Sequence, residues 1–193
     1  MKRSLPEKFC MAPFVHMYVH SNESERVCCM TTEEGGIRPN EELDLTKRWN
    51  SEHLKNIRRQ FLTNREPDIC TKCFSNERAG GISDRMRFND MYVGEINPDV
   101  VTGNQYGSPI DLDIRPGNLC NLGCRMCGPI SSSTIQKETQ KNPLMQLILG
   151  KGDIATTDVL KNANNLEFLL RNADKGKRIK FLGGEPTIMP EVD

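Results

Sequence analysis

Apolar and polar residues alternate along short runs of this chain, which marks them as strand candidates. Val15–His20 alternates in this way, and Arg26–Met30 returns after the polar turn Ser21–Glu25, so together they predict a β-hairpin. Ile110–Ile114 also alternates, and Arg178–Leu182 is a further strand candidate. The pattern therefore predicts a hairpin near the N-terminus and two more strands in the second half.

Apolar residues at helical spacing predict two amphipathic helices. The first is capped by Asn50 or Ser51 and has an apolar face made of Leu54, Ile57, Phe61 and Leu62. The second runs over Thr156–Asn172, is capped at its first residues, and has an apolar side made of Val159, Leu160, Ala163, Leu166, Leu169 and Leu170. A polar helical stretch between them is predicted to break at Gly80-Gly81, and residues 141–155 are predicted to form a surface insertion.

Polar residues on the strand candidates have two readings. His16 and His20 alternate with apolar residues, and we expect them to face solvent. Asp111 and Asp113 alternate in the same way within Ile110–Ile114. They either face a polar active-site cavity or cap an incomplete fold, and the sequence favours neither.

Three cysteines follow the strand candidate Ile110–Ile114 after a break at Pro116-Gly117. Cys120, Cys124 and Cys127 form a C-x3-C-x2-C loop, and no fourth cysteine stands at similar spacing. Structural zinc sites use four ligands, and electron-transfer clusters are usually closed by four cysteines. Three thiolates on a [4Fe–4S] cluster instead leave one iron open to bind a small molecule. The triplet therefore favours such a cluster over a partial zinc site.

A second motif, Gly183-Gly-Glu-Pro186, directly follows the strand candidate Arg178–Leu182. Two glycines at a strand end expose backbone amides and carbonyls, and Glu185 adds a negative charge. Strand, metal loop and helix in this order start a β/α-barrel unit, and barrel active sites lie at the C-terminal ends of the strands.

These two motifs, one after each strand, resemble those of the radical S-adenosylmethionine (SAM) enzymes. The resemblance implies that Cys120, Cys124 and Cys127 hold a [4Fe–4S] cluster whose open iron is chelated by SAM. It implies that the amino end of SAM lies in a cradle formed by Gly183, Gly184, Glu185 and Pro186. It further implies that Met126, at a position that is often aromatic in the family, contacts the adenine.

The resemblance also implies an oxidoreductase reaction. An electron from a reductant such as flavodoxin or ferredoxin cleaves SAM to methionine and a 5′-deoxyadenosyl radical, which removes hydrogen from a substrate. By the same resemblance, the substrate is a peptide or a protein side chain.

A different cysteine pattern occupies the first half of the chain. The predicted hairpin carries Cys10 near one end and the Cys28-Cys29 pair at the other, and Cys70 and Cys73 form a distant C-x2-C. Neighbouring strand residues point to opposite faces, so only one of Cys28 and Cys29 joins the others, and the sequence does not say which. Four thiolates can hold either an auxiliary iron–sulfur cluster or zinc.

This arrangement resembles the auxiliary-cluster domains of radical SAM proteins, called SPASM or, in the shorter form, twitch. In those proteins the module usually follows the barrel, whereas here it precedes it. The predicted fold is therefore α/β: a small α+β cysteine-rich, twitch-like module over residues 1–108, then a partial parallel β/α barrel of radical SAM type over residues 109–193.

Composition argues against several classes of protein. The 26 basic residues equal the 26 acidic ones, which argues against nucleic-acid binding through bulk charge. No apolar run is long enough to span a membrane, and no apolar segment follows the basic N-terminus as in a signal peptide. Eight cysteines without an export signal predict metal ligation in the cytoplasm rather than disulfides.

The apolar content of the chain is low for a fold that is stable by itself. The hydrophobic fraction is 36% and the mean hydropathy is −0.57. Two strands after residue 108 cannot close a barrel, so we expect this sequence to be the front part of a longer or truncated protein. The rival interpretation is a non-catalytic metal-binding module that retains remnants of the motifs.

Overall fold

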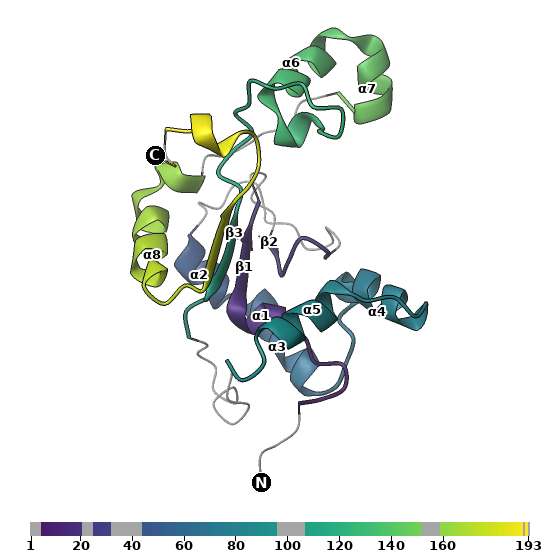
Figure 1. The fold of residues 1–193 in the computed structure, drawn as a ribbon, viewed down its shortest axis with the longest axis vertical. Helices are drawn as coiled ribbons and strands as arrows, with labels where there is room; N and C mark the ends of the chain where they lie inside the picture. Colours follow the sequence, from purple (N-terminus) through teal and green to yellow (C-terminus); the bar gives the residue numbers. More distant parts are fainter. Residues whose placement is uncertain are drawn as a thin grey trace.

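The protein is an α/β protein built on one four-stranded sheet (Figure 1). The structure is a computed structural model of the 193-residue chain, and it describes residues 5–20, 25–31, 44–95, 107–151, 159–190 and 192. The strand order is β2-β1-β3-β4. Three strands run parallel to one another, β1 (His16–Val19), β3 (Asp111–Ile114) and β4 (Arg178–Phe181), and β2 (Glu25–Arg26) pairs antiparallel with β1.

The predicted strands are confirmed, but the returning strand of the hairpin is shorter than predicted. β2 ends at Arg26 because the chain then turns, and the Thr31 amide and hydroxyl both donate to the Cys28 carbonyl. Cys28 and Cys29 therefore lie in a turn rather than in a strand. The predicted boundary at residue 108 separates two segments that contribute neighbouring strands to the same sheet.

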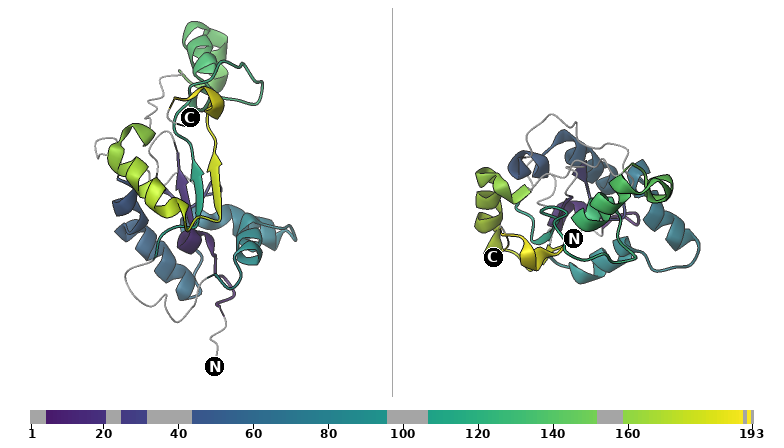
Figure 2. Two further views of the ribbon diagram at one scale, coloured as in Figure 1. Left: turned by 60° about the vertical axis from the view of Figure 1, so that its left-hand side comes forward. Right: turned by 90° about the horizontal axis from the view of Figure 1, so that it is seen from above.

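One face of the sheet is apolar and forms a core. Met17 and Val19 of β1 lie level with Leu112 and Ile114 of β3, and all four are buried. Helices α2 (Leu45–Trp49) and α8 (Ala163–Ala173) cover this face, as the views from the side and from above show (Figure 2).

The opposite face is polar because the strands alternate. The register places His16, Asp111 and Arg178 in one row across the three parallel strands. Tyr18, Asp113 and Lys180 form the next row, closer to the C-terminal ends of the strands. His16 and His20 are buried, so the prediction that they face solvent was wrong. The reason is that β1 lies inside the sheet and that the Phe88 ring packs against His16.

A second core lies beside the sheet. It packs together four helices: α1 (Ala12–Val15), α3 (Glu52–Leu62), α4 (Thr71–Arg78) and α5 (Asp84–Met91). The Ser51 hydroxyl caps α3, and Leu54, Ile57 and Phe61 are buried as predicted. The predicted break at Gly80-Gly81 is also confirmed, since α4 and α5 end and begin on either side of it.

The predicted helix Thr156–Asn172 begins later than expected. Residues 152–158 lie outside the described ranges; a 3-10 turn follows over Val159–Lys161, and α8 then starts after its N-cap Asn162. Its buried side includes Asn165, which accepts from the Leu45 amide at 3.0 Å and donates to the Val159 carbonyl at 3.2 Å. These bonds turn the helix so that Leu166, Leu170 and Ala163 are exposed, against the prediction.

Residues 141–155, predicted as a surface insertion, contain a helix. α6 (Ser133–Lys141) and α7 (Pro143–Leu149) form a helical hairpin at the C-terminal end of the sheet (Figure 1). Asn142 makes the reversal, since its side chain caps α7 by accepting from the amides of Leu144 and Met145. Within the described ranges, no helix is long and apolar enough to cross a membrane.

Asp111 is the most heavily bonded carboxylate on the polar face. The Tyr92 hydroxyl donates to it at 2.7 Å, Arg178 donates from both Nε and an Nη, and His16 Nδ1 lies 3.4 Å away. Burial raises the pKa of Asp111, but the nearby His16 ring and the hydrogen bonds from Arg178 outweigh it and hold the pKa well below its usual range. The ionised Asp111 carboxylate of β3 therefore links the end of α5 to β1 and β4.

We expect Asp111→Asn to lower the free energy of unfolding by about 3 kcal/mol at pH 7, because it leaves Arg178 without its carboxylate. A carboxylate with a lowered pKa stabilises the fold above its unfolded pKa of about 3.9 and stops doing so as the pH falls below the folded value. The difference between the variants should therefore shrink in urea titrations carried out towards pH 2.

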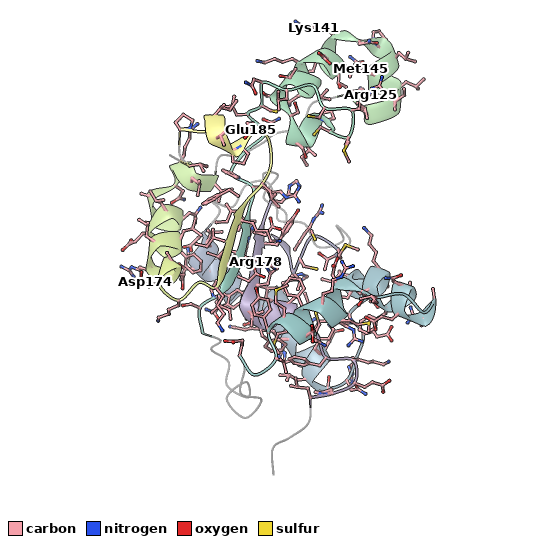
Figure 3. All side chains as sticks on the ribbon, in the orientation of Figure 1. Arg125, Lys141, Met145, Asp174, Arg178 and Glu185 are labelled. Atoms are coloured by element: carbon pink, nitrogen blue, oxygen red, sulfur yellow. The ribbon has the colours of Figure 1, made fainter. Side chains whose placement is uncertain are left out.

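Asp174→Asn is the matched control, because Asp174 is exposed at the end of α8 (Figure 3). It should change stability by no more than about 0.5 kcal/mol. Equal unfolding energies for Asp111→Asn and the wild type at pH 7 would contradict the role of Asp111.

Candidate functional site

The cysteine loop lies at the C-terminal end of β3 and is fixed to the start of α6. The Cys120 amide donates to the Ser133 hydroxyl at 3.1 Å. The Cys120 carbonyl accepts from the hydroxyls of Ser133 at 3.1 Å and Thr134 at 2.7 Å. These three hydrogen bonds fix the backbone of Cys120 to the first turn of α6.

The three thiols of the loop are neighbours. Cys120 is buried, Cys127 is half-buried and Cys124 is exposed. Burial raises the pKa of Cys127, and so do the nearby thiols of Cys124 and Cys120. Across the described part of the chain, however, no three His, Cys, Asp or Glu side chains are arranged to hold a metal ion. The loop gathers the donors without setting them in coordination geometry.

The Gly-Gly-Glu-Pro segment docks on the residues that lead from β3 into the cysteine loop. The Gly184 amide donates to the Gly117 carbonyl at 3.2 Å, and the Glu185 amide donates to the Leu119 carbonyl at 2.8 Å. A Cβ atom at Gly184 would lie 2.0 Å from the Leu119 oxygen, so only glycine allows this approach. Gly183 adopts a φ of +103°, which also favours glycine. The two motifs are thus joined backbone to backbone.

This contact changes the role of the glycines. They were expected to expose backbone amides for a ligand, but the amides of Gly184 and Glu185 are bonded to the residues that lead into the cysteine loop. The Glu185 carboxylate accepts from the amide and hydroxyl of Thr187, which lowers its pKa, and Pro186 begins the 3-10 turn η4 (Pro186–Ile188). Met126 is 97% exposed and extends into solvent.

The cysteines of the N-terminal half form a second group. Four of them line one small cavity against α4 and α5: Cys10, Cys28, Cys70 and Cys73. Burial raises the pKa of the Cys70 thiol to about 12, with a further contribution from Cys73. Burial also raises the pKa of Cys10 well above its usual value, followed by the nearby Cys28. The enclosed space is about 20 Å³, roughly room for one water-sized sphere.

Cys29 lies outside this group. Its side chain is exposed, and its pKa is raised by burial of part of the thiol and by the carboxylates of Asp84 and Asp113. The turn after β2 thus directs Cys28 to the cysteine cavity and Cys29 to the polar face of the sheet. The adjacent positions of the two residues had left this choice open.

The polar face carries a pocket, and only some of its lining residues were predicted from the sequence. Its volume is about 160 Å³, and its lining includes His16, Cys29, Asp84, Arg87, Asp113, Arg178 and Lys180. Asp113 was expected either to face a cavity or to cap an incomplete fold, and it lines this pocket. Lys180 and Arg178 were missed, although their alternation with Ile179 and Phe181 on a parallel strand was the signal that could have found them.

No protein-family model, curated protein or solved structure matches the chain. The case for a function therefore rests on the residues and their geometry.

The contact between the two motifs gives a prediction. Gly184→Ala should destabilise the protein by about 2 kcal/mol, because the new methyl group would overlap the Leu119 carbonyl. It should also speed proteolysis within the cysteine loop, measured by mass spectrometry of the fragments.

Gly123→Ala is the matched control within the same loop, since a Cβ there would meet no atom within 4 Å. Its stability and cleavage rate should remain close to those of the wild type. If both alanine variants behaved alike, the motifs would not depend on this close approach.

Proposed function

We propose that this protein is a radical SAM enzyme that binds a [4Fe–4S] cluster through Cys120, Cys124 and Cys127 and binds SAM beside it. The observation that carries the proposal is the docking of Gly184 and Glu185 on the carbonyls of Gly117 and Leu119, which lead directly into the cysteine loop. Two motifs that are about sixty residues apart in the sequence meet at one edge of a parallel sheet, where α/β proteins usually bind their ligands.

The residues fit the cluster by their chemistry. None of the eight cysteines is in a disulfide, so each can lose its proton to become a metal-binding thiolate, and we propose a reducing compartment such as the cytoplasm for this protein. Three thiols on one loop are the donor set for a cluster with one open iron. Because no coordination geometry is preformed in the described residues, the proposal depends on the donor set and its position.

When bound and reduced, the cluster and SAM together would supply a radical that removes hydrogen from a substrate. The chain itself would do three things. Ser133 and Thr134 would hold the Cys120 backbone, the glycines would keep the second motif against the loop, and Glu185 would place a carboxylate at that edge. Flavodoxin or ferredoxin would be suitable electron donors, and a peptide or protein a suitable substrate.

For the N-terminal group we propose a metal site formed by Cys10, Cys28, Cys70 and Cys73, with Cys29 outside it. An auxiliary iron–sulfur cluster and zinc both suit four thiolates. The small enclosed space favours a single zinc ion, because a cubane cluster requires the walls to move apart. A protein that binds only this metal would be a non-catalytic module, the alternative function.

Iron content and SAM cleavage test the proposed enzyme. After anaerobic reconstitution, the wild type should hold about four irons at the loop and release methionine from SAM under dithionite. Cys124→Ala should lose those irons and the cleavage, because Cys124 is one of three ligands. One zinc per chain without cleavage in the wild type would identify the alternative module, and unchanged cleavage in Cys124→Ala would refute the site.

The adjacent cysteines offer a separate comparison for the second site. Cys28→Ala should release the metal of the N-terminal group, whereas Cys29→Ala should retain it, as measured by inductively coupled plasma mass spectrometry for iron and zinc. The reason is that Cys28 lines the cavity with the other thiols and Cys29 does not. Equal loss from both variants, or from neither, would contradict the assignment.

A further inference from the structure

The pocket on the polar face of the sheet has a lining of mixed charge. Lys180, Arg178 and Arg87 contribute cations, and Asp113 and Asp84 contribute carboxylates. The pocket shares Asp84 and Phe88 of α5 with the cysteine cavity, so one wall separates the two. It therefore lies between the proposed metal site of the N-terminal half and the C-terminal ends of β3 and β4.

Asp111 and Asp113, both on β3, differ in their hydrogen bonding. Asp111 has hydrogen-bond donors from Tyr92 and Arg178. Asp113 is only 3% exposed, yet its Oδ1 atom has no hydrogen-bond partner. Lys180 Nζ lies 3.7 Å from Asp113 Oδ2, and Arg115 Nε lies 4.0 Å from Oδ1. Both separations exceed hydrogen-bond length, and a buried acceptor without a donor costs free energy.

The separation between Asp113 and Lys180 defines what can fill it, since both residues line the pocket. A single atom or small group about 2.8 Å from Lys180 Nζ and from Asp113 Oδ2 would bridge their gap of 3.7 Å. That group must donate to Asp113 and accept from Lys180, which a hydroxyl or a carboxamide does.

Charged groups fit this position less well. At the position between Lys180 and Asp113, an ammonium ion would meet the cation of Lys180, and a carboxylate would meet the anion of Asp113. A water molecule satisfies the same two atoms, but it needs only about 10–15 Å³. The pocket measures about 160 Å³, so it has room for a ligand of several atoms.

We propose that this pocket binds a neutral polar ligand, whose hydroxyl or carboxamide group donates to Asp113 and accepts from Lys180. Its use as the substrate pocket of a radical reaction rests on the proposed function, whereas the binding itself does not. A peptide and a polyol both offer this chemistry.

Titrations of the full ¹⁵N-labelled chain, followed by amide chemical shifts, test the proposal. Acetamide and ethylene glycol are the neutral probes, and acetate and ethylammonium are charged probes of similar size. We expect at least one neutral probe to shift the amides around Asp113 and Lys180 in a saturable way, with a Kd at least fivefold lower than that of either charged probe. Preference for acetamide would indicate an amide ligand, and preference for ethylene glycol a hydroxyl ligand.

Variants show whether Asp113 is responsible. Asp113→Leu should raise the Kd of the preferred probe at least tenfold. If that variant does not fold, Lys180→Met removes the neighbouring cation from a partly exposed position and should raise the Kd about threefold, whereas Lys137→Met on the exposed side of α6 should not.

Saturable shifts that favour a charged probe, no saturable shift with either neutral probe, or a Kd unchanged in the folded variants would overturn the proposal. Water alone would then account for the gap. Because the titration needs neither cluster nor SAM, binding without SAM cleavage would reject the enzyme and retain the ligand site.

Discussion

One buried carboxylate connects the two halves of this protein. Asp111 of β3 contacts His16 of β1 and Arg178 of β4, and it also accepts a hydrogen bond from Tyr92 at the end of α5. The parallel register depends on these partners lying level with one another. With the register fixed, the apolar residues face α2 and α8, and every second residue lines a polar face on the other side.

The same register positions the chemistry. β3 and β4 end side by side, so the loops that follow them meet (Figure 1). Gly184 allows the second loop to approach the Leu119 carbonyl of the first, and the side-chain view shows Glu185 at that junction while Arg178 lies along β4 (Figure 3). The cysteine loop, the glycine motif and the polar pocket are therefore consequences of one strand arrangement.

Sequence alone predicted the local elements well. The strands at residues 15–20, 110–114 and 178–182 were visible because alternation is a local pattern, and the cap and apolar face of α3 were visible for the same reason. Long-range pairing was not visible. The sequence could not show that β1 lies beside β3, so the burial of His16 and His20 was missed.

In the candidate site, too, local spacing was visible in the sequence, whereas long-range contacts were not. Spacing identified the cysteine triplet, but the choice between Cys28 and Cys29 needed the turn after β2. The glycines were recognised, yet their contact with the segment before Cys120 depended on the pairing of two strands whose neighbouring residues are 67 positions apart in the sequence. Polar residues such as Lys180 gain meaning only from the register that places them opposite Asp113.

The most direct measurement is electron paramagnetic resonance of the reconstituted, dithionite-reduced protein with and without SAM. The account predicts a [4Fe–4S]⁺ signal whose g-values change when SAM is added, because the three thiols of the cysteine loop leave one iron open. A signal that SAM does not alter, or the absence of any cluster signal, would contradict it.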